Sequence, residues 1–318
     1  MIKVLTEGSS KFGFGHIIRC LTIVNYCRKN NIEVSFVVDG DSTSQELIEN
    51  NGGVITNWKN LEYIDSEIGG NDIVIMDSYN TNLEQINKIN EKAKRVCIID
   101  DINRLNFENI VFVNPNFSAT ELSFTNQSNV YLVGSDYVML REEFVGVKFN
   151  KFNKTIKKVL ITLGGSDVNN LTPVLMKYFK ENHPNLELNI VVGFGYNNIE
   201  EIKSGQEANN NLFYNLKADE MVKMMIDNDI VVCAAGQTVN EIIKLGVPAC
   251  FIEVIDNQKI NINYLNHNDM GVVVNELSDI KRIFDNEYRL KLFKKLSKVD
   301  NNTSGAQNIV EYLIKEVI

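Results

Sequence analysis

The chain has 318 residues, of which 44% are hydrophobic and 23% charged, a composition typical of a globular protein long enough for two domains. The formal net charge of −9 argues against a protein whose main task is to grip a nucleic-acid backbone, because such proteins present a basic face. None of the five cysteines forms a C-x-x-C pair, which favours a reducing compartment. We see no signal peptide and no apolar run long enough to cross a bilayer, so we expect a cytoplasmic protein without membrane insertion.

Strands and helices alternate along the first half of the chain. The apolar segment 2–5 leads into a Gly-rich loop at 8–15, an amphipathic helical pattern at 16–29 and a second strand at 33–38. This order predicts a βαβ unit with parallel strands. The alternation continues with expected strands at 72–76, 95–99, 110–113 and 130–133, and an expected helix at 82–94.

The same pattern restarts after a polar, basic stretch at 146–156. A strand at 157–163 runs into Gly-Gly-Ser-Asp and a helix, and the chain from about 257 onward reads mainly as helices. Further strands are expected at 186–192, 211–213, 230–234 and 248–252. We therefore predict an α/β protein with two tandem parallel-sheet domains, 1–150 and 151–303, with one larger sheet as the alternative.

The first Gly-rich loop is a candidate ligand-binding segment. Gly13 and Gly15 allow close approach of the backbone to a ligand or a positive φ angle. His16 is expected at a helix N-terminus, where the helix dipole disfavours the imidazolium and leaves a neutral imidazole able to act as a base. The alternative is that His16 caps the helix and the glycines only shape a turn.

A second candidate follows the strand that opens the second half. Gly165 and Ser166 lie between this strand and the next helix, a setting that suits a phosphate contact, with Ser166 or Asp167 as the expected helix N-cap. A plain capped turn is the alternative.

A third loop of small residues precedes another expected helix. Its N–H groups at Gly236 could hold a diphosphate, and Thr238 would add a hydroxyl. Glu241 would lie one helical turn further along on the same face, where a carboxylate can accept both hydroxyls of a ribose. The alternative for Glu241 is an ordinary surface glutamate.

Acidic side chains follow two strands of the first half. Asp100 and Asp101 could bind a divalent metal or orient a water molecule, but no His or Cys lies nearby in the sequence. For Asp77 and Tyr79 we favour hydrogen bonding or substrate contact over metal binding, and we predict no metal site. The roles of Asp100 and Asp101 stay open.

Five stretches resemble, in the same order, the signatures of the UDP-sugar hydrolases of the pseudaminic-acid pathway and of related spore-coat polysaccharide proteins. They are FGFGHIIRCLTI, DSYN, YVMLREEF, VLITLGGSDVNNLT, and AAGQTVNEIIKLGVP with a later NQ. Each stretch alone is weakly specific, whereas five in order across nearly the whole chain are strongly specific.

The resemblance implies a GT-B fold, related to MurG-type glycosyltransferases, with two Rossmann-like domains, a cleft between them and a C-terminal helix, 304–318, that packs back on the first domain. It implies a cofactor-free, metal-independent hydrolysis of a UDP-2,4-diacetamido-2,4,6-trideoxyhexose, with inversion, that releases UDP. It assigns the reacting centre to His16, Tyr79 and Asn257, with His16 as the base. It assigns nucleotide or sugar contacts to Gly13, Gly15, Arg19, Asp77, Gly165, Ser166, Gly236, Thr238, Glu241 and Gln258.

Departures from the family pattern lie in the nucleotide and sugar pockets. Gln237 stands where the family has a small residue, and Asn240 where it has a bulky aromatic one. The exact sugar and the nucleotide therefore stay open, and the sequence does not give the oligomeric state. A glycosyltransferase of the same fold is the main alternative, and a non-catalytic nucleotide-sugar binding protein is another.

Overall fold

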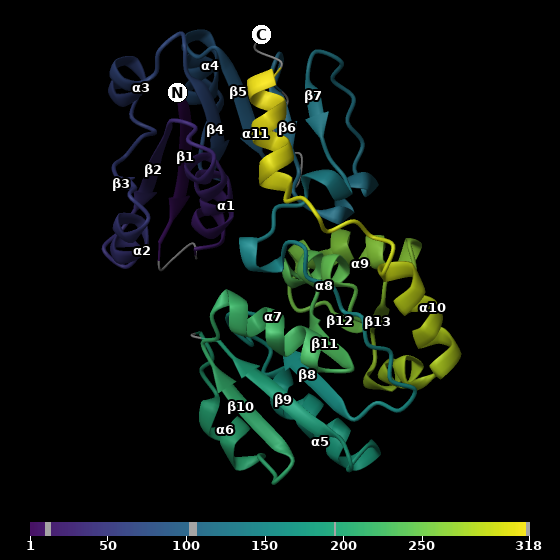
Figure 1. Ribbon diagram of the computed structural model, residues 1–318. Helices are drawn as coiled ribbons and strands as arrows, with labels where there is room; N and C mark the ends of the chain where they lie inside the picture. The colour runs from purple at the N-terminus through teal and green to yellow at the C-terminus, as the bar shows by residue number, and fades with distance from the viewer. Residues whose placement is uncertain (10–13, 102–106, 194, 316–318) are drawn as a thin grey trace. The chain divides into compact units, whose positions relative to one another are not determined.

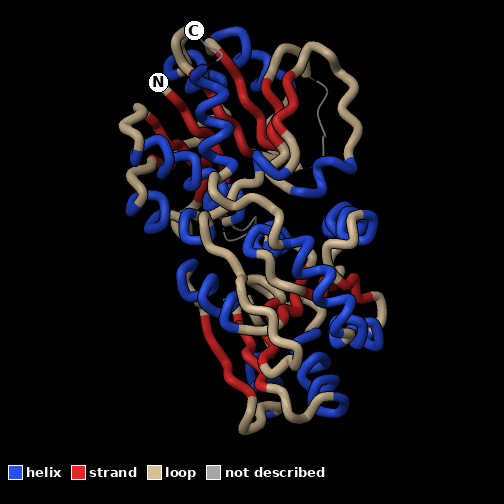
Figure 2. The backbone as a smooth tube through the Cα atoms, turned by 45° about the vertical axis from the view of Figure 1, so that its right-hand side comes forward, coloured by secondary structure: helices blue, strands red, loops and turns tan. Residues whose placement is uncertain are grey.

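The computed structural model describes residues 1–9, 14–101, 107–193 and 195–315 (Figure 1). The chain divides into two compact units, one formed by Met1–Glu142 with Thr303–Ile318 and the other by Glu143–Asn302. The first division lies at 142/143, where the sequence pattern suggested residue 150. Each unit contains one parallel sheet, and helices flank its strands (Figure 2).

The sheet of the first unit has seven strands within the described residues, in the order β3-β2-β1-β4-β5-β6-β7. Every neighbouring pair is parallel, and in the register of the central strand Ile2 lies between Val34 and Ile73. The strands are β1 Ile2–Gly8, β2 Val34–Gly40, β3 Val54–Ile55, β4 Ile73–Asp77, β5 Arg95–Ile99, β6 Val111–Val113 and β7 Val130–Leu132.

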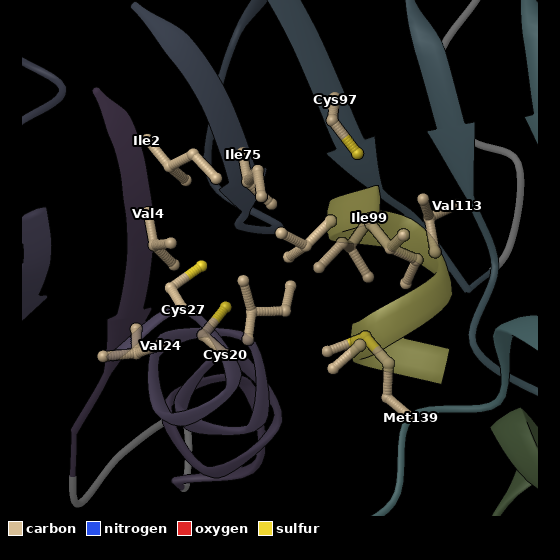
Figure 3. Packing of buried hydrophobic residues seen from close by; sticks show 14 of the residues in the cluster. Ile2, Val4, Cys20, Val24, Cys27, Ile75, Cys97, Ile99, Val113 and Met139 are labelled. Atoms are coloured by element: carbon tan, nitrogen blue, oxygen red, sulfur yellow. The ribbon is translucent and has the colours of Figure 1, made fainter. Parts of the chain in front are cut away.

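Helices cover both faces of this sheet because alternate strand residues point to opposite sides. On one face, Cys20, Val24 and Cys27 of α1 pack toward β1 and β4 (Figure 3). The C-terminal helix α11 joins the same apolar cluster through Ile309 and Val310. The helices of this unit are α1 Gly15–Lys29, α2 Gln45–Asn50, α3 Leu61–Glu67, α4 Leu83–Lys92 and α11 Gly305–Lys315.

The second unit repeats this plan with six strands in its described residues, in the order β10-β9-β8-β11-β12-β13. The strands are β8 Lys158–Thr162, β9 Glu187–Val192, β10 Asn210–Tyr214, β11 Ile230–Ala234, β12 Ala249–Ile252 and β13 Val272–Val274. The helices are α5 Leu171–Asn182, α6 Ile199–Ser204, α7 Ala218–Asp227, α8 Thr238–Leu245, α9 Lys259–His267 and α10 Asn286–Leu296. The mainly helical reading of the chain after 257 missed β13, which is only three residues long.

The strand order of both sheets fixes where a ligand is expected. The chain starts at a central strand, winds outward to one edge and then returns to the other side, so the winding reverses between β1 and β4 and again between β8 and β11. Open α/β sheets bind ligands beyond the carboxyl ends of the strands at this reversal. No helix in the described ranges is both long and apolar enough to cross a membrane.

Candidate functional site

A partly buried histidine–aspartate contact lies at the reversal point of the first sheet. Asp77 is the last residue of β4 and is fully buried, and His16 is the second residue of α1, the helix that follows β1. The His16 Nδ1 atom lies 2.7 Å from Asp77 Oδ1. The side chain of His16 is 13% exposed, so its ring contacts Asp77 on the buried side and reaches the surface on the other.

Arg19 joins this aspartate to a second one. It follows His16 by three residues and so lies on the same face of α1. Its Nε and Nη2 atoms donate to the two carboxylate oxygens of Asp77 at 2.8 and 2.7 Å. Its Nη1 atom donates to both oxygens of Asp101 at 2.7 and 2.9 Å. One guanidinium therefore fixes two carboxylates with charge-assisted hydrogen bonds.

The charge of Asp77 determines which nitrogen of His16 carries a proton. Burial opposes ionisation of Asp77, but the charge of Arg19 and the hydrogen bonds from His16 and Arg19 outweigh it and lower its pKa to about 2. An ionised carboxylate only accepts hydrogen bonds, so the short contact requires the proton on Nδ1 of His16. In the neutral ring Nε2 then holds the lone pair, and this tautomer is the one that can accept a proton at Nε2.

Tyr79 completes the group. Its ring meets the His16 ring edge-on, with centroids 4.5 Å apart and an interplanar angle of 84°. Its hydroxyl donates to Asp101 Oδ2 at 2.7 Å. Burial and the negative charge of Asp101 raise the pKa of Tyr79, so the phenol stays protonated and remains a donor.

The structure resolves the position of Asp101, whose role the sequence left open. Asp101 lies in the network, and its neighbour Asp100 is buried with its N–H donating to Val113 O at 2.9 Å. Asn114 donates to the Asp101 carbonyl at 2.8 Å, and Asn116 to its Oδ1 at 2.9 Å.

Among the described residues, no three or more His, Cys, Asp or Glu side chains are grouped to hold a metal ion. Gly13 lies outside the described residues.

In the second unit, the loop after β8 contains Gly164 at φ +85°, a conformation that favours glycine. The expectation that Ser166 or Asp167 is the N-cap of the next helix is wrong, because Asn170 occupies that position. Asp167 nevertheless supplies the capping carboxylate, which accepts the N–H groups of Leu171 and Thr172 at 2.8 and 2.6 Å. These donors of α5 are therefore already used by the chain itself.

The loop after β8 rests on the loop after β9. The N–H of Gly195 donates to Gly165 O at 2.8 Å. A Cβ atom on Gly193 would lie 2.5 Å from the same oxygen, so only glycine fits there without displacement. This packing fixes the backbone of Gly165 and Ser166 at the reversal point of the second sheet.

The loop after β11 faces this one across the reversal point. Thr238 opens α8, and Glu241 lies in the first turn of the same helix, half-buried. A Cβ atom on Gly236 would lie 3.5 Å from Nε2 of Gln258, so these two predicted residues are neighbours. Asn257 is exposed beside Gln258.

The two departures from the family pattern, at the N-cap and in the first turn of α8, contact each other. The Nδ2 atom of Asn240 donates to Oε1 of Gln237 at 3.2 Å. At the start of α8, this polar pair replaces the small and aromatic residues of the family pattern.

Two hollows of about 310 and 420 Å³ lie elsewhere in the second unit, around His183 and Pro184. The first lies near the amino ends of β9 and β10 and the second near those of β8 and β9, and none of the predicted site residues lines either. The hydrogen-bonded groups at the strand reversals remain the candidate site.

Comparison with known proteins gives matches over most of the chain. The model of the glycosyltransferase family 28 C-terminal domain matches residues 144–314. Uncharacterized protein MJ1062 of Methanocaldococcus jannaschii is 27% identical over 272 residues, which cover 78% of this chain and 54% of that protein. A pseudaminic acid cytidylyltransferase and UDP-2,4-diacetamido-2,4,6-trideoxy-beta-L-altropyranose hydrolase of Helicobacter pylori is 24% identical, over 81% of this chain and 45% of that protein.

The crystal structure of Acinetobacter baumannii MurG is similar in fold, with a TM-score of 0.62 and 16% identity, over 98% of this chain and 99% of that one. The predicted fold class, two Rossmann-like domains on parallel sheets, is confirmed. The cleft between them stays a prediction. The chain spans about half the length of the two curated relatives named above.

Proposed function

The chain belongs to the glycosyltransferase family 28 C-terminal domain family, and from this premise we propose that it is an enzyme that hydrolyses a UDP-sugar at its anomeric carbon. The observation that carries the proposal is the 2.7 Å contact between His16 Nδ1 and Asp77 Oδ1. It supports a base at Nε2 of His16, because the ionised aspartate holds the proton on the other nitrogen.

In the proposed reaction, Nε2 of His16 takes a proton from a water molecule. The water oxygen attacks the anomeric carbon from the face opposite the diphosphate. The bond between that carbon and the diphosphate oxygen breaks, and its electron pair leaves with UDP. The products are UDP and a free sugar of inverted configuration.

The second unit would hold the nucleotide. Gly236 and Thr238 would contact the diphosphate at the N-terminus of α8, and Glu241 would accept the ribose hydroxyls. Gly165 and Ser166 would face them from the loop after β8, and Gln258 lies against Gly236. Backbone N–H groups aimed at a leaving diphosphate stabilise the negative charge that develops there.

In the first unit, Tyr79 and Gly15 would shape the sugar pocket, and Arg19 would hold Asp77 in place. For Asn257 we propose a contact with the substrate near its reacting end. The sugar of the Helicobacter pylori relative, a 2,4-diacetamido-2,4,6-trideoxyhexose, is the first substrate to test. The proposed enzyme needs neither a metal nor a cofactor and works in the cytoplasm.

Transfer of the sugar to an acceptor is the second candidate function. Three observations support transfer. They are the similarity in fold to MurG, the family 28 match, and His16 as a base that a transferase would also need. The two candidates differ in what attacks the anomeric carbon, since a transferase uses an acceptor hydroxyl where a hydrolase uses water.

The experiment is UDP release from UDP-2,4-diacetamido-2,4,6-trideoxy-β-L-altropyranose by the purified chain, without acceptor and with EDTA. Hydrolysis predicts equal amounts of UDP and free sugar. Release that requires an added acceptor would favour the transferase. Absence of release from this and other UDP-sugars, with or without acceptors, would contradict both.

A further inference from the structure

Glu7 is a buried carboxylate at the carboxyl end of the central strand β1. Its Oε1 atom accepts the N–H of Tyr79 at 2.7 Å, and the N–H and Nδ2 of Asn80 at 3.3 and 3.1 Å. Its Oε2 atom binds the ammonium of Lys59. That ammonium also lies 2.9 Å from Oδ2 of Asp39. The loop that carries Tyr79 is thus tied to the first two strands of the sheet.

This ion pair is charged at neutral pH. Burial opposes ionisation of Glu7, but Lys59, Asn80 and the Tyr79 N–H outweigh it and hold the pKa of Glu7 below its ordinary value. Burial also opposes the charge of Lys59, whose pKa is nevertheless raised by Glu7 and Asp39. The side chains of Glu7 and Lys59 are only 4% and 13% exposed, so both lie largely beneath the surface.

The backbone at Tyr79 depends on this carboxylate because the sheet no longer supports it. The pairing of β1 with β4 ends where Thr6 lies opposite Asp77, two residues before Tyr79. Beyond that point, the Glu7 side chain accepts the N–H group of Tyr79. Glu7 therefore holds the main chain of Tyr79 and Asp101 holds its hydroxyl, and the two contacts together set the ring against His16.

We propose that Glu7, paired with Lys59, is a positioning residue that holds the main chain of Tyr79 and so helps to set its ring against His16. Glu7 acts through Tyr79 and contacts no substrate. Its effect on turnover rests on the proposed function, whereas its effect on the His16 ring does not. Both Glu7 and Lys59 lie outside the motifs that carry the family resemblance.

The test uses histidine ring signals, because the chain has only three histidines. In protein labelled with ¹³C-histidine, the Hε1 resonance of His16 reports the neighbouring Tyr79 ring. We expect Glu7→Gln and Lys59→Met to shift this resonance in the same direction as Tyr79→Leu, while the signals of His183 and His267 stay in place. Asp65→Asn is the matched control, since it breaks an exposed ion pair with Lys88 in the same unit.

The kinetic measurement uses the UDP-sugar named above. A misplaced pocket residue should lower kcat roughly tenfold or more with a smaller change in KM, because the ring that flanks the base has moved. Asp65→Asn should leave both constants unchanged.

Shifted His16 signals in both Glu7→Gln and Lys59→Met support the positioning role, even if the wild type proves inactive and the proposed function fails. Unshifted His16 signals in folded Glu7→Gln and Lys59→Met proteins overturn it, whatever the activity. Should Glu7→Gln fail to fold, Lys59→Met alone decides between these outcomes.

Discussion

His16 Nδ1 lies 2.7 Å from Oδ1 of the fully buried Asp77, and Arg19 binds both oxygens of the same carboxylate. The aspartate therefore orients the imidazole, and the arginine orients the aspartate. A base held in one tautomer by a buried carboxylate is a recurring arrangement in enzymes.

Replacement of Asp77 by asparagine tests this tautomer. An amide can donate its N–H₂ to Nδ1 and so move the ring proton to Nε2, where it blocks base catalysis. We expect kcat for UDP release to fall by about a hundredfold or more. Asp101→Asn is the control, because Asp101 also binds Arg19 but does not contact Nδ1 of His16. An equal loss in both variants would contradict a special role for Asp77.

Asp77 should also make stability depend on pH. Its folded pKa, about 2, lies below the ordinary value of 3.8, so the unfolded chain binds more protons between these values. The stabilisation, about 2 kcal/mol, is fully present above pH 4 and is lost as the pH falls toward 2. Urea unfolding at a series of pH values should show that wild type and Asp77→Asn converge in this window. A constant difference across it would contradict the assignment.

Glu241→Ala tests the ribose contact. Removal of a ground-state contact to the nucleotide should raise KM for the UDP-sugar roughly tenfold and change kcat less. Steady-state kinetics of UDP release measures both. Equal losses in kcat and kcat/KM would instead place Glu241 in stabilisation of the transition state.

Gly193→Ala tests the support beneath the Gly165 loop. The added methyl would lie 2.5 Å from Gly165 O, so we expect a loss of about 1–3 kcal/mol in the free energy of unfolding. Gly205→Ala is the matched control, since its Cβ would make only ordinary contacts from 3.6 Å. Thermal melts that lower Tm equally for the two variants would contradict the packing described.

Much of the fold could be predicted because long apolar runs alternate with helical patterns. The strand 2–5 and the helix 16–29 are examples, and in the structure they correspond to β1 and α1. The edge strands β3 and β13 were missed because two or three apolar residues carry little periodicity, although the equally short β6 and β7 were predicted.

Part of the site was visible in the sequence because its residues lie at a strand end, since Asp77 ends β4 and Tyr79 follows it. Their connections were not visible, since Arg19 and Asp101 are 82 residues apart. Glu7 was missed because it falls between the predicted strand 2–5 and the predicted Gly-rich loop 8–15, whereas β1 extends through it to Gly8. Its charge within that strand was the one signal that could have singled it out.

The most direct measurement compares wild type with His16→Ala in UDP release from UDP-2,4-diacetamido-2,4,6-trideoxy-β-L-altropyranose, without acceptor and with EDTA, alongside calorimetry of UDP binding. We expect turnover to fall by orders of magnitude in His16→Ala while UDP binds as in wild type. Unchanged turnover in His16→Ala would contradict His16 as the base and with it the proposed mechanism.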